Sequence, residues 1–172
     1  MKKITATELK SILASHKLWI ETNGVQGTRA NLRDANLRDA NLRDAYLTDA
    51  YLTDADLTDA DLTGAILEGA NLYDANLRFA NLRFANLRGA ILAGAVLCDA
   101  NLKDADLRDA DLRDANLRDA NLTGTILDKD KAEKQPEVSP CKVANIAGTR
   151  QALEKLAKEH GMKIDSISLS FI

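Results

Sequence analysis

The 172-residue chain has few of the residues that usually build a core or frame a small secreted protein. Aromatic residues make up only 4% of it, so a core has to come from leucine and alanine. Its 2 prolines argue against a proline-rich linker or a disordered tail. Its 2 cysteines, Cys98 and Cys141, exclude a disulfide-framed scaffold, and they can pair only if the C-terminal tail folds back along the chain.

The chain also has no strong excess of one charge and no long apolar run. The formal net charge is −3, with 28% charged residues of both signs, so the basic face that binds nucleic acid is not expected. No run of about 18 apolar residues is present, and no membrane-spanning segment is expected. Charged residues from Glu8 to Lys17 interrupt the apolar stretch that an export signal needs. We therefore expect a cytoplasmic protein with neither nucleic acid nor membrane as a partner.

Residues for catalysis or metal binding are scarce and scattered. His16 and His160 are the two histidines, and they stand near opposite ends of the chain. The two cysteines lack CxxC spacing, and neither HExxH nor a phosphate-binding loop motif occurs. The regularly spaced aspartates are typical of a solvated surface rather than of an acid–base pair. We predict no catalytic residue, no metal and no cofactor, and a small-molecule or metal-dependent enzyme is the least favoured alternative.

A five-residue repeat fills the middle of the chain. Leucine occupies every fifth position from Leu32 to Leu127, and alanine every fifth position from Ala30 to Ala120. On a helix, at about 100° per residue, leucines at this spacing would spread around the whole cylinder. The step from alanine to leucine is a strand step, whereas the longer step to the next alanine requires a bend. Each unit therefore predicts a short extended piece and a corner, which together wind the chain into stacked coils around an Ala/Leu interior.

The corners carry a second regularity. The last position of each unit is Asp or Gly nearly everywhere, and Phe79 and Phe84 are exceptions. Glycine, and less readily aspartate, accepts the positive φ of a type II turn. Four leucines are preceded by an aliphatic residue instead of Asn or Asp: Ile66, Ile91, Val96 and Ile126. A glycine stands two residues before each of these four, and the pattern gives no reason for this association.

This pattern resembles the pentapeptide-repeat family, in which a small residue, Asp or Asn, Leu or Phe, and two variable residues recur. The resemblance covers residues 30–129, and His16, Trp19 and Gly24 match a stretch that precedes the repeats in many members. It implies an all-β solenoid, a right-handed quadrilateral β-helix with four units per coil and about five coils. The proportions are similar to those of short cyanobacterial members, for most of which the family offers no biochemical role.

Stacking of every twentieth residue defines the predicted core. One inner column is expected to contain these leucines: Leu32, Leu52, Leu72, Leu92 and Leu112. Trp19 is expected to pack on the first coil rather than to bind a ligand. Alanine must be small where two walls meet, so a larger residue at Ala75 is expected to overpack the interior.

Three parts are expected along the chain, and both ends of the coil stack need a lid. Residues 1–24 are predicted to form a capping helix and an extended segment that leads into the repeats. Thr5 and Glu8 make a capping-box pattern that predicts a helix from about Ala6 to His16, followed by an extended stretch from Leu18. Residues 25–129 form the repeats.

Residues 130–172 are predicted to form a loop, a helix from about Thr149 to His160, and a strand. Two interpretations are open for this C-terminal part. It closes the last coil as a second lid, or it is a dimerisation element, because a helix and a strand exceed what a lid requires.

Function has to lie on the outer surface of the coils. An apolar patch of outward residues is predicted to bind a protein partner or a second copy, unless it packs under the tail or is spread over several faces: Tyr73, Phe79, Phe84, Ile91 and Val96. An acidic belt is predicted around the second coil: Asp49, Asp54, Asp56, Asp59 and Asp61.

The preferred function is a non-catalytic interaction scaffold with an unknown protein partner. A homodimer through the C-terminal part or the apolar patch is also open. The resemblance supplies a further alternative, because some pentapeptide-repeat proteins mimic duplex DNA and bind type II topoisomerases such as gyrase. The acidic belt favours this alternative, while the short repeat region and its arginines oppose it.

Overall fold

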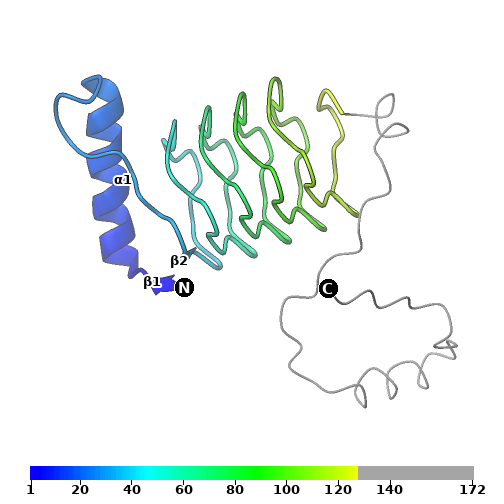
Figure 1. Ribbon diagram of the computed structural model, residues 1–172, viewed down its shortest axis with the longest axis horizontal. Helices are drawn as coiled ribbons and strands as arrows, with labels where there is room; N and C mark the ends of the chain where they lie inside the picture. The colour runs from blue at the N-terminus through cyan, green and yellow to red at the C-terminus, as the bar shows by residue number, and fades with distance from the viewer. Residues whose placement is uncertain (128–172) are drawn as a thin grey trace, which may run out of the picture. The chain divides into compact units, whose positions relative to one another are not determined.

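The computed structural model describes residues 1–127, which form one helix, two short strands and a series of stacked coils (Figure 1). Strand β1 (Lys2–Lys3) precedes helix α1 (Ala6–Glu21), and strand β2 (Ala35–Asn36) belongs to the first coil. β1 pairs in parallel with β2, with Lys2 opposite Ala35. This strand was not expected from the sequence, and it covers part of the backbone edge that the first coil would otherwise expose. Among the described residues, no helix is long and apolar enough to cross a membrane.

Helix α1 begins as the sequence predicts. The Thr5 side chain accepts a hydrogen bond from the backbone N–H of Glu8 at 3.2 Å. The Glu8 carboxylate in turn accepts from the backbone N–H of Thr5 at 2.8 Å, so that both halves of the capping box are present. Ile4 and Leu9 pack against the core on either side of this cap. The helix start at Ala6 is therefore confirmed.

The predicted end of the helix at His16 is wrong, and so is the extended stretch from Leu18. Helix α1 continues to Glu21. No residue between His16 and Glu21 breaks a helix, and Trp19 stacks on His16 one turn earlier, with ring centroids 5.6 Å apart. The helix ends where Asn23 and Gly24 take positive φ values of 50° and 84°.

The coils have a register of twenty residues. Parallel backbone bridges join residues twenty positions apart, from Asn31 with Tyr51 to Asn101 with Asn121. Four units therefore make one coil, and each unit lies against the corresponding unit of the next coil. We name the four stacks of units columns A, B, C and D. They begin with the units that contain Leu32, Leu37, Leu42 and Leu47, in that order.

The interior consists of the repeated leucines and alanines. Leu32, Leu52, Leu72 and Leu92 are each exposed by at most 1%, and Leu112 is partly buried against the same core. The predicted inner column is thus buried over its first four members and partly buried at the fifth. These side chains are the main apolar area that the coils remove from water.

In the middle of the stack, five successive residues that begin with Asn or Asp use all of their backbone N–H groups, as the stretch from Asn76 to Ala80 illustrates. The N–H groups of Asn76, Leu77 and Phe79 donate to carbonyls of the neighbouring coils at 2.7–3.1 Å, and that of Ala80 donates to Leu77 across the corner. The remaining N–H, of Arg78, donates to the Asn76 side-chain Oδ1 at 3.3 Å. This last bond explains why Asn or Asp so often precedes leucine. The Asn or Asp side chain accepts from the one backbone N–H that no backbone carbonyl accepts.

The corners have the predicted backbone conformation. Every last position from Asp34 to Gly124 has a positive φ, including Phe79 and Phe84. At Gly94 the Oδ1 atom of Asp74, one coil earlier, occupies the space that a Cβ would need. Gly89 has no atom within 4 Å of that position, so the association of glycine with a following aliphatic residue has no common cause in the structure.

Candidate interaction surface

Two phenylalanines occupy adjacent corners of the third coil. Phe79 ends a unit of column B and Phe84 ends the next unit, in column C. They flank the outer wall that carries Asn81 and Arg83. Phe79 is 49% exposed and Phe84 55% exposed, so each ring presents a large apolar surface to solvent.

Both phenylalanines have a backbone conformation that is unusual for a bulky residue. The φ values are 59° for Phe79 and 58° for Phe84, within the left-handed region. The corner below Phe79 in column B is Asp59, and the corner above it is Asp99. A bulky residue in this region costs of order 1–3 kcal/mol, and such residues concentrate at functional sites.

An arginine lies beside each of the two rings. The Arg78 guanidinium carbon is 5.4 Å from the centroid of Phe79, and that of Arg83 is 5.1 Å from the centroid of Phe84. Within residues 1–127 neither arginine forms an ion pair, and the Nε atoms of both are buried without a hydrogen-bond acceptor. The surface therefore combines two exposed rings with two guanidinium groups that form no ion pair within the described residues.

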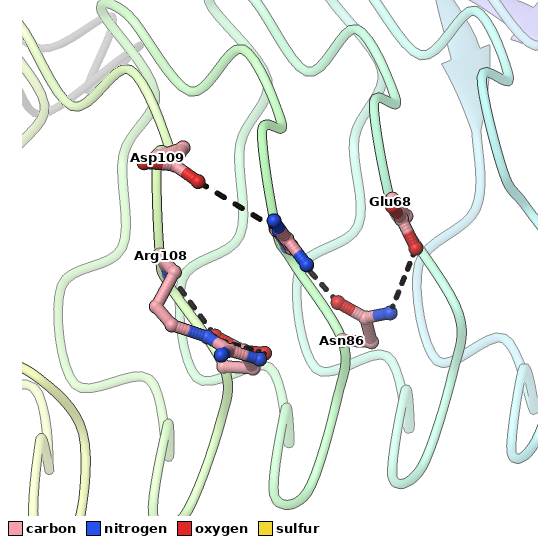
Figure 2. A network of polar contacts seen from close by, with 6 residues as sticks. Glu68, Asn86, Arg108 and Asp109 are labelled. Atoms are coloured by element: carbon pink, nitrogen blue, oxygen red, sulfur yellow. Dashed lines mark hydrogen bonds and ion pairs between the residues drawn. The ribbon is translucent and has the colours of Figure 1, made fainter.

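Most other arginines of the repeats do contact a carboxylate. Figure 2 shows one such network on column D, where Asn86 donates to Glu68 at 3.2 Å and Arg108 pairs with the adjacent Asp106. In the same network Arg88 lies 3.7 Å from Asp109. Within the described residues, Arg78 and Arg83 differ in this respect from most arginines of the repeats, although Arg33 of the first coil, which lies over the Tyr51 ring, also has no ion pair.

Arg78 and Arg83 differ from two arginines of the first coil in the residue that stands eighteen positions later. Arg38 and Arg43 of the first coil pair with the carboxylates eighteen residues later, Asp56 at 3.4 Å and Asp61 at 3.1 Å. The residues eighteen positions after Arg78 and Arg83 are Val96 and Asn101, which carry no charge. These two arginines were not predicted as site residues, although this register signal is visible in the sequence once the coil length is known.

The other members of the predicted apolar patch lie in columns A and B. Tyr73 is 48% exposed and Ile91 39% exposed, and both belong to column A. Val96 is half-buried in column B of the fourth coil. The five candidates are thus distributed over columns A, B and C.

The predicted acidic belt is partly neutralised by arginines of the first coil. Asp56 is only 5% exposed and pairs with Arg38, which also lies 3.9 Å from Asp59. Asp61 pairs with Arg43, and the pKa of Asp61 is lowered, chiefly by the hydrogen bond from Thr63.

Asp49 is half-buried, and its carbonyl accepts a hydrogen bond from Arg29. Among the five carboxylates, Asp54 is exposed and has no ion pair within the described residues. The belt therefore does not present five unpaired negative charges.

His16 attaches α1 to the first coil. Its Nδ1 accepts a hydrogen bond from the backbone N–H of Ala30 at 3.1 Å, and its ring is fully buried against Trp19. Burial lowers the pKa of His16, and the Nε2 atom is buried without a hydrogen-bond partner among the described residues. Trp19 is also 5.7 Å from the guanidinium carbon of Arg29, so it packs in the joint between helix and coil.

No group of three or more potential metal ligands occurs in residues 1–127. Cys98 is fully buried, and Cys141, the residue with which it can pair only if the tail folds back, lies outside the described residues. His160 and the C-terminal part 130–172, with both interpretations of it, also fall outside the part of the chain that the structure describes.

The repeat that decides the architecture also decides the family. The family described as Pentapeptide repeats matches residues 28–64, 55–92 and 90–128, in 8 copies. The chain belongs to the pentapeptide repeat family. Its twenty-residue register and buried leucines are the structural expression of that membership.

Solved pentapeptide repeat proteins from cyanobacteria are similar to this one. A protein from Cyanothece 51142 is 40% identical, with 56% of each chain covered and a TM-score of 0.40. The protein alr5209 from Nostoc Pcc 7120 is 35% identical, with 72% of this chain and 74% of that chain covered and a TM-score of 0.41. QnrB1, a plasmid-mediated fluoroquinolone resistance protein, is 19% identical, with 64% of this chain and 72% of that chain covered and a TM-score of 0.30.

The comparisons do not assign a role. The chain covers only 56% of the Cyanothece protein, so what that protein does as a whole does not carry over. No curated protein matches the sequence. Function therefore has to be argued from the outer surface of this pentapeptide repeat protein.

Proposed function

We propose that this pentapeptide repeat protein is a non-catalytic interaction scaffold. In this proposal the repeats form a rigid, right-handed quadrilateral β-helix of about five coils, and the third coil binds a protein partner through Phe79 and Phe84. The observation that carries the proposal is the pair of half-exposed phenylalanines held at positive φ in adjacent corners.

Stability gives no reason for phenylalanine at these two corners. Asp or Gly fills the other corners from Asp34 to Gly124 and takes the same conformation with less strain. Leaving a large ring exposed also forgoes the free energy that its burial would contribute. Aromatic residues and arginine are enriched at the centres of protein–protein interfaces, where both ring and guanidinium become buried.

We assign no catalytic step to the described residues. His16 is buried, accepts a hydrogen bond from Ala30 and stacks on Trp19, so its ring has a structural role. The pairing of Asp56 and Asp61 with arginines also removes support from DNA mimicry, and no second function is proposed.

The test is a comparison of partner capture by the full chain and by a double variant, Phe79→Asn with Phe84→Asn. Asparagine adopts positive φ readily and carries no charge, so the corners should keep their shape. Proteins that the wild type captures from the source cell are identified, purified and titrated by calorimetry. We expect the double variant to bind at least tenfold more weakly and to unfold at the same or a higher temperature.

The matched control is Tyr46→Asn, which removes a 43% exposed aromatic residue from the first coil. We expect it to bind the partner as the wild type does. Unchanged affinity in the double variant would overturn the proposal, and so would a lower unfolding temperature with unchanged affinity, because that result indicates a packing role. Light scattering in parallel tests whether the partner is a second copy of the chain.

A further inference from the structure

We infer that the partner segment carries carboxylates, and that Arg78 and Arg83 bind them beside the two phenylalanine rings. This inference rests on the proposed function, since it specifies the chemistry of the partner that the third coil binds. The site comprises Arg78, Phe79, Arg83 and Phe84, all within one coil.

Unused pairing capacity at the two arginines supports the inference. A guanidinium has five N–H donors, and an incoming carboxylate can accept two of them at once. Arg78 and Arg83 are half-buried, their Nε atoms are shielded from solvent without an acceptor, and the adjacent contact at each is a phenylalanine ring. A half-buried guanidinium interacts more strongly with an anion than a fully hydrated one does.

No aspartate of a neighbouring corner forms an ion pair with Arg78 or Arg83 within residues 1–127. Asp59, below Phe79 in column B, lies 3.9 Å from Arg38 of the first coil. The Oδ1 atom of Asp104, above Phe84 in column C, lies against the corner of Gly124 in the following coil. Asp99, above Phe79 in column B, and Asp104 have no ion pair within the described residues, and neither lies within ion-pair distance of Arg78 or Arg83.

A short acidic protein segment fits this surface better than a long polyanion does. Residues 30–129 contain 18 acids and 11 bases, a net charge of −7, so the surface as a whole repels a nucleic acid. A segment with a few carboxylates and an apolar side chain matches the local combination of two cations and two exposed rings.

The test uses a random library of twelve-residue peptides, displayed on phage and selected on the folded full chain. Enriched peptides are synthesised and titrated against the wild type, against Arg78→Gln with Arg83→Gln, and against Phe79→Asn with Phe84→Asn. We expect enrichment of Asp and Glu beside an apolar residue, and at least a tenfold loss of affinity in each double variant. A duplex DNA oligonucleotide is expected not to compete.

A further variant neutralises an arginine without removing it. Asn101→Asp places a carboxylate eighteen residues after Arg83, the same relation that Asp61 has to Arg43. We expect this variant to bind acidic peptides about tenfold more weakly than the wild type does. Asn41→Asp adds the same charge to column C in the first coil, two coils from Arg83. At the usual strand spacing this is about 10 Å, roughly one Debye length at 0.1 M salt, so Asn41→Asp should weaken binding much less than Asn101→Asp does.

The possible outcomes separate the two proposals. Peptides that depend on Phe79 and Phe84 but show no acidic preference, or that bind Arg78→Gln with Arg83→Gln normally, would leave the scaffold in place and overturn the acidic partner. No enrichment of any peptide that depends on the two phenylalanines would count against both. Equal weakening by Asn41→Asp and Asn101→Asp would reduce the effect to overall charge and would also overturn the inference.

Discussion

His16 Nδ1 accepts a hydrogen bond from the backbone N–H of Ala30, the first alanine of the repeat, at 3.1 Å. This bond joins α1 to the coil that the helix covers. The ring must be neutral at Nδ1 to accept it, because a protonated histidine has donors at both nitrogens. The attachment of the N-terminal helix is therefore sensitive to the protonation of one side chain.

We expect the protein to lose stability as the pH falls below about 6.5, the ordinary pKa of histidine. Burial of the ring lowers the pKa of His16, so the unfolded chain binds the proton more readily than the native one. Stability is thus fully present above the unfolded pKa and is lost progressively as pH falls toward the lower folded pKa. Chemical denaturation at several pH values between 7.5 and 5 measures this effect.

The control for this prediction is His16→Asn, which keeps an acceptor but does not titrate. We expect it to be less stable at pH 7.5 and to show a flatter pH dependence than the wild type. His160→Gln, which changes the other histidine, should retain the wild-type slope. A slope that persists in His16→Asn would show that another group is responsible.

Ala75→Leu should destabilise the coils by about 1–3 kcal/mol or more. The Ala75 side chain is fully buried and surrounded by core residues, so added methylenes have to displace neighbours. The free energy of unfolding from urea titration is the measurement. Thr53→Leu adds a leucine at an outward position and should cost much less. Similar losses in the two variants would contradict a tightly packed interior.

Gly94→Ala should destabilise the protein more than Gly89→Ala. Both corners have positive φ, 70° and 63°, so alanine is strained by of order 1–2 kcal/mol at either one. A Cβ at position 94 also meets the Asp74 carboxylate, whereas no atom lies within 4 Å at position 89. Adding Asp74→Ala should recover the excess loss at position 94, which a double-mutant cycle measures. Equal effects at the two glycines would mean that the carboxylate moves aside freely.

The Asp106 carboxylate should titrate with a pKa of about 2. Hydrogen bonds from the Arg108 side chain are the main cause, followed by the Arg108 backbone N–H. Arg108→Gln should move the pKa most of the way back to the ordinary 3.8, as followed by the NMR shift of the carboxyl carbon. The stabilisation from this pair is present above the unfolded pKa and is lost as pH falls toward 2. An unchanged pKa in the variant would assign the shift to another group.

Period and side-chain size were enough to predict the interior from the sequence. Leucine at every fifth position excludes a helix on geometry alone, and Leu32, Leu52, Leu72 and Leu92 are buried as expected. Positive φ at the corners also followed from the Asp and Gly residues there. These predictions succeed because each depends on a few neighbouring residues.

The number of units per coil does not follow from the period. A five-residue unit with a corner fits coils of several sizes, so the twenty-residue register came from the resemblance and is confirmed by the bridges. The end of α1 was misplaced because the residues around Trp19 read equally well as helix or strand without their contact to His16.

The candidate site was predicted only in part. Phe79 and Phe84 stand out in the sequence because they replace the usual corner residues, but their arginine neighbours do not. That Arg83 lacks a partner becomes visible only when Asn101 is compared with Asp61 at the matching place in an earlier coil. Such relations depend on the coil length, which local patterns do not contain.

The twenty-residue register acts like a reading frame for the surface. Removing one five-residue unit between Arg38 and Asp56 would leave the leucines inside, but every later side chain would move to the preceding column, and Arg38 would no longer face Asp56. Removing a whole coil would shorten the stack and leave the columns in place. Insertions and deletions of a complete coil are therefore tolerated. Any smaller insertion or deletion changes which side chains are neighbours on the outer surface, while the interior is preserved.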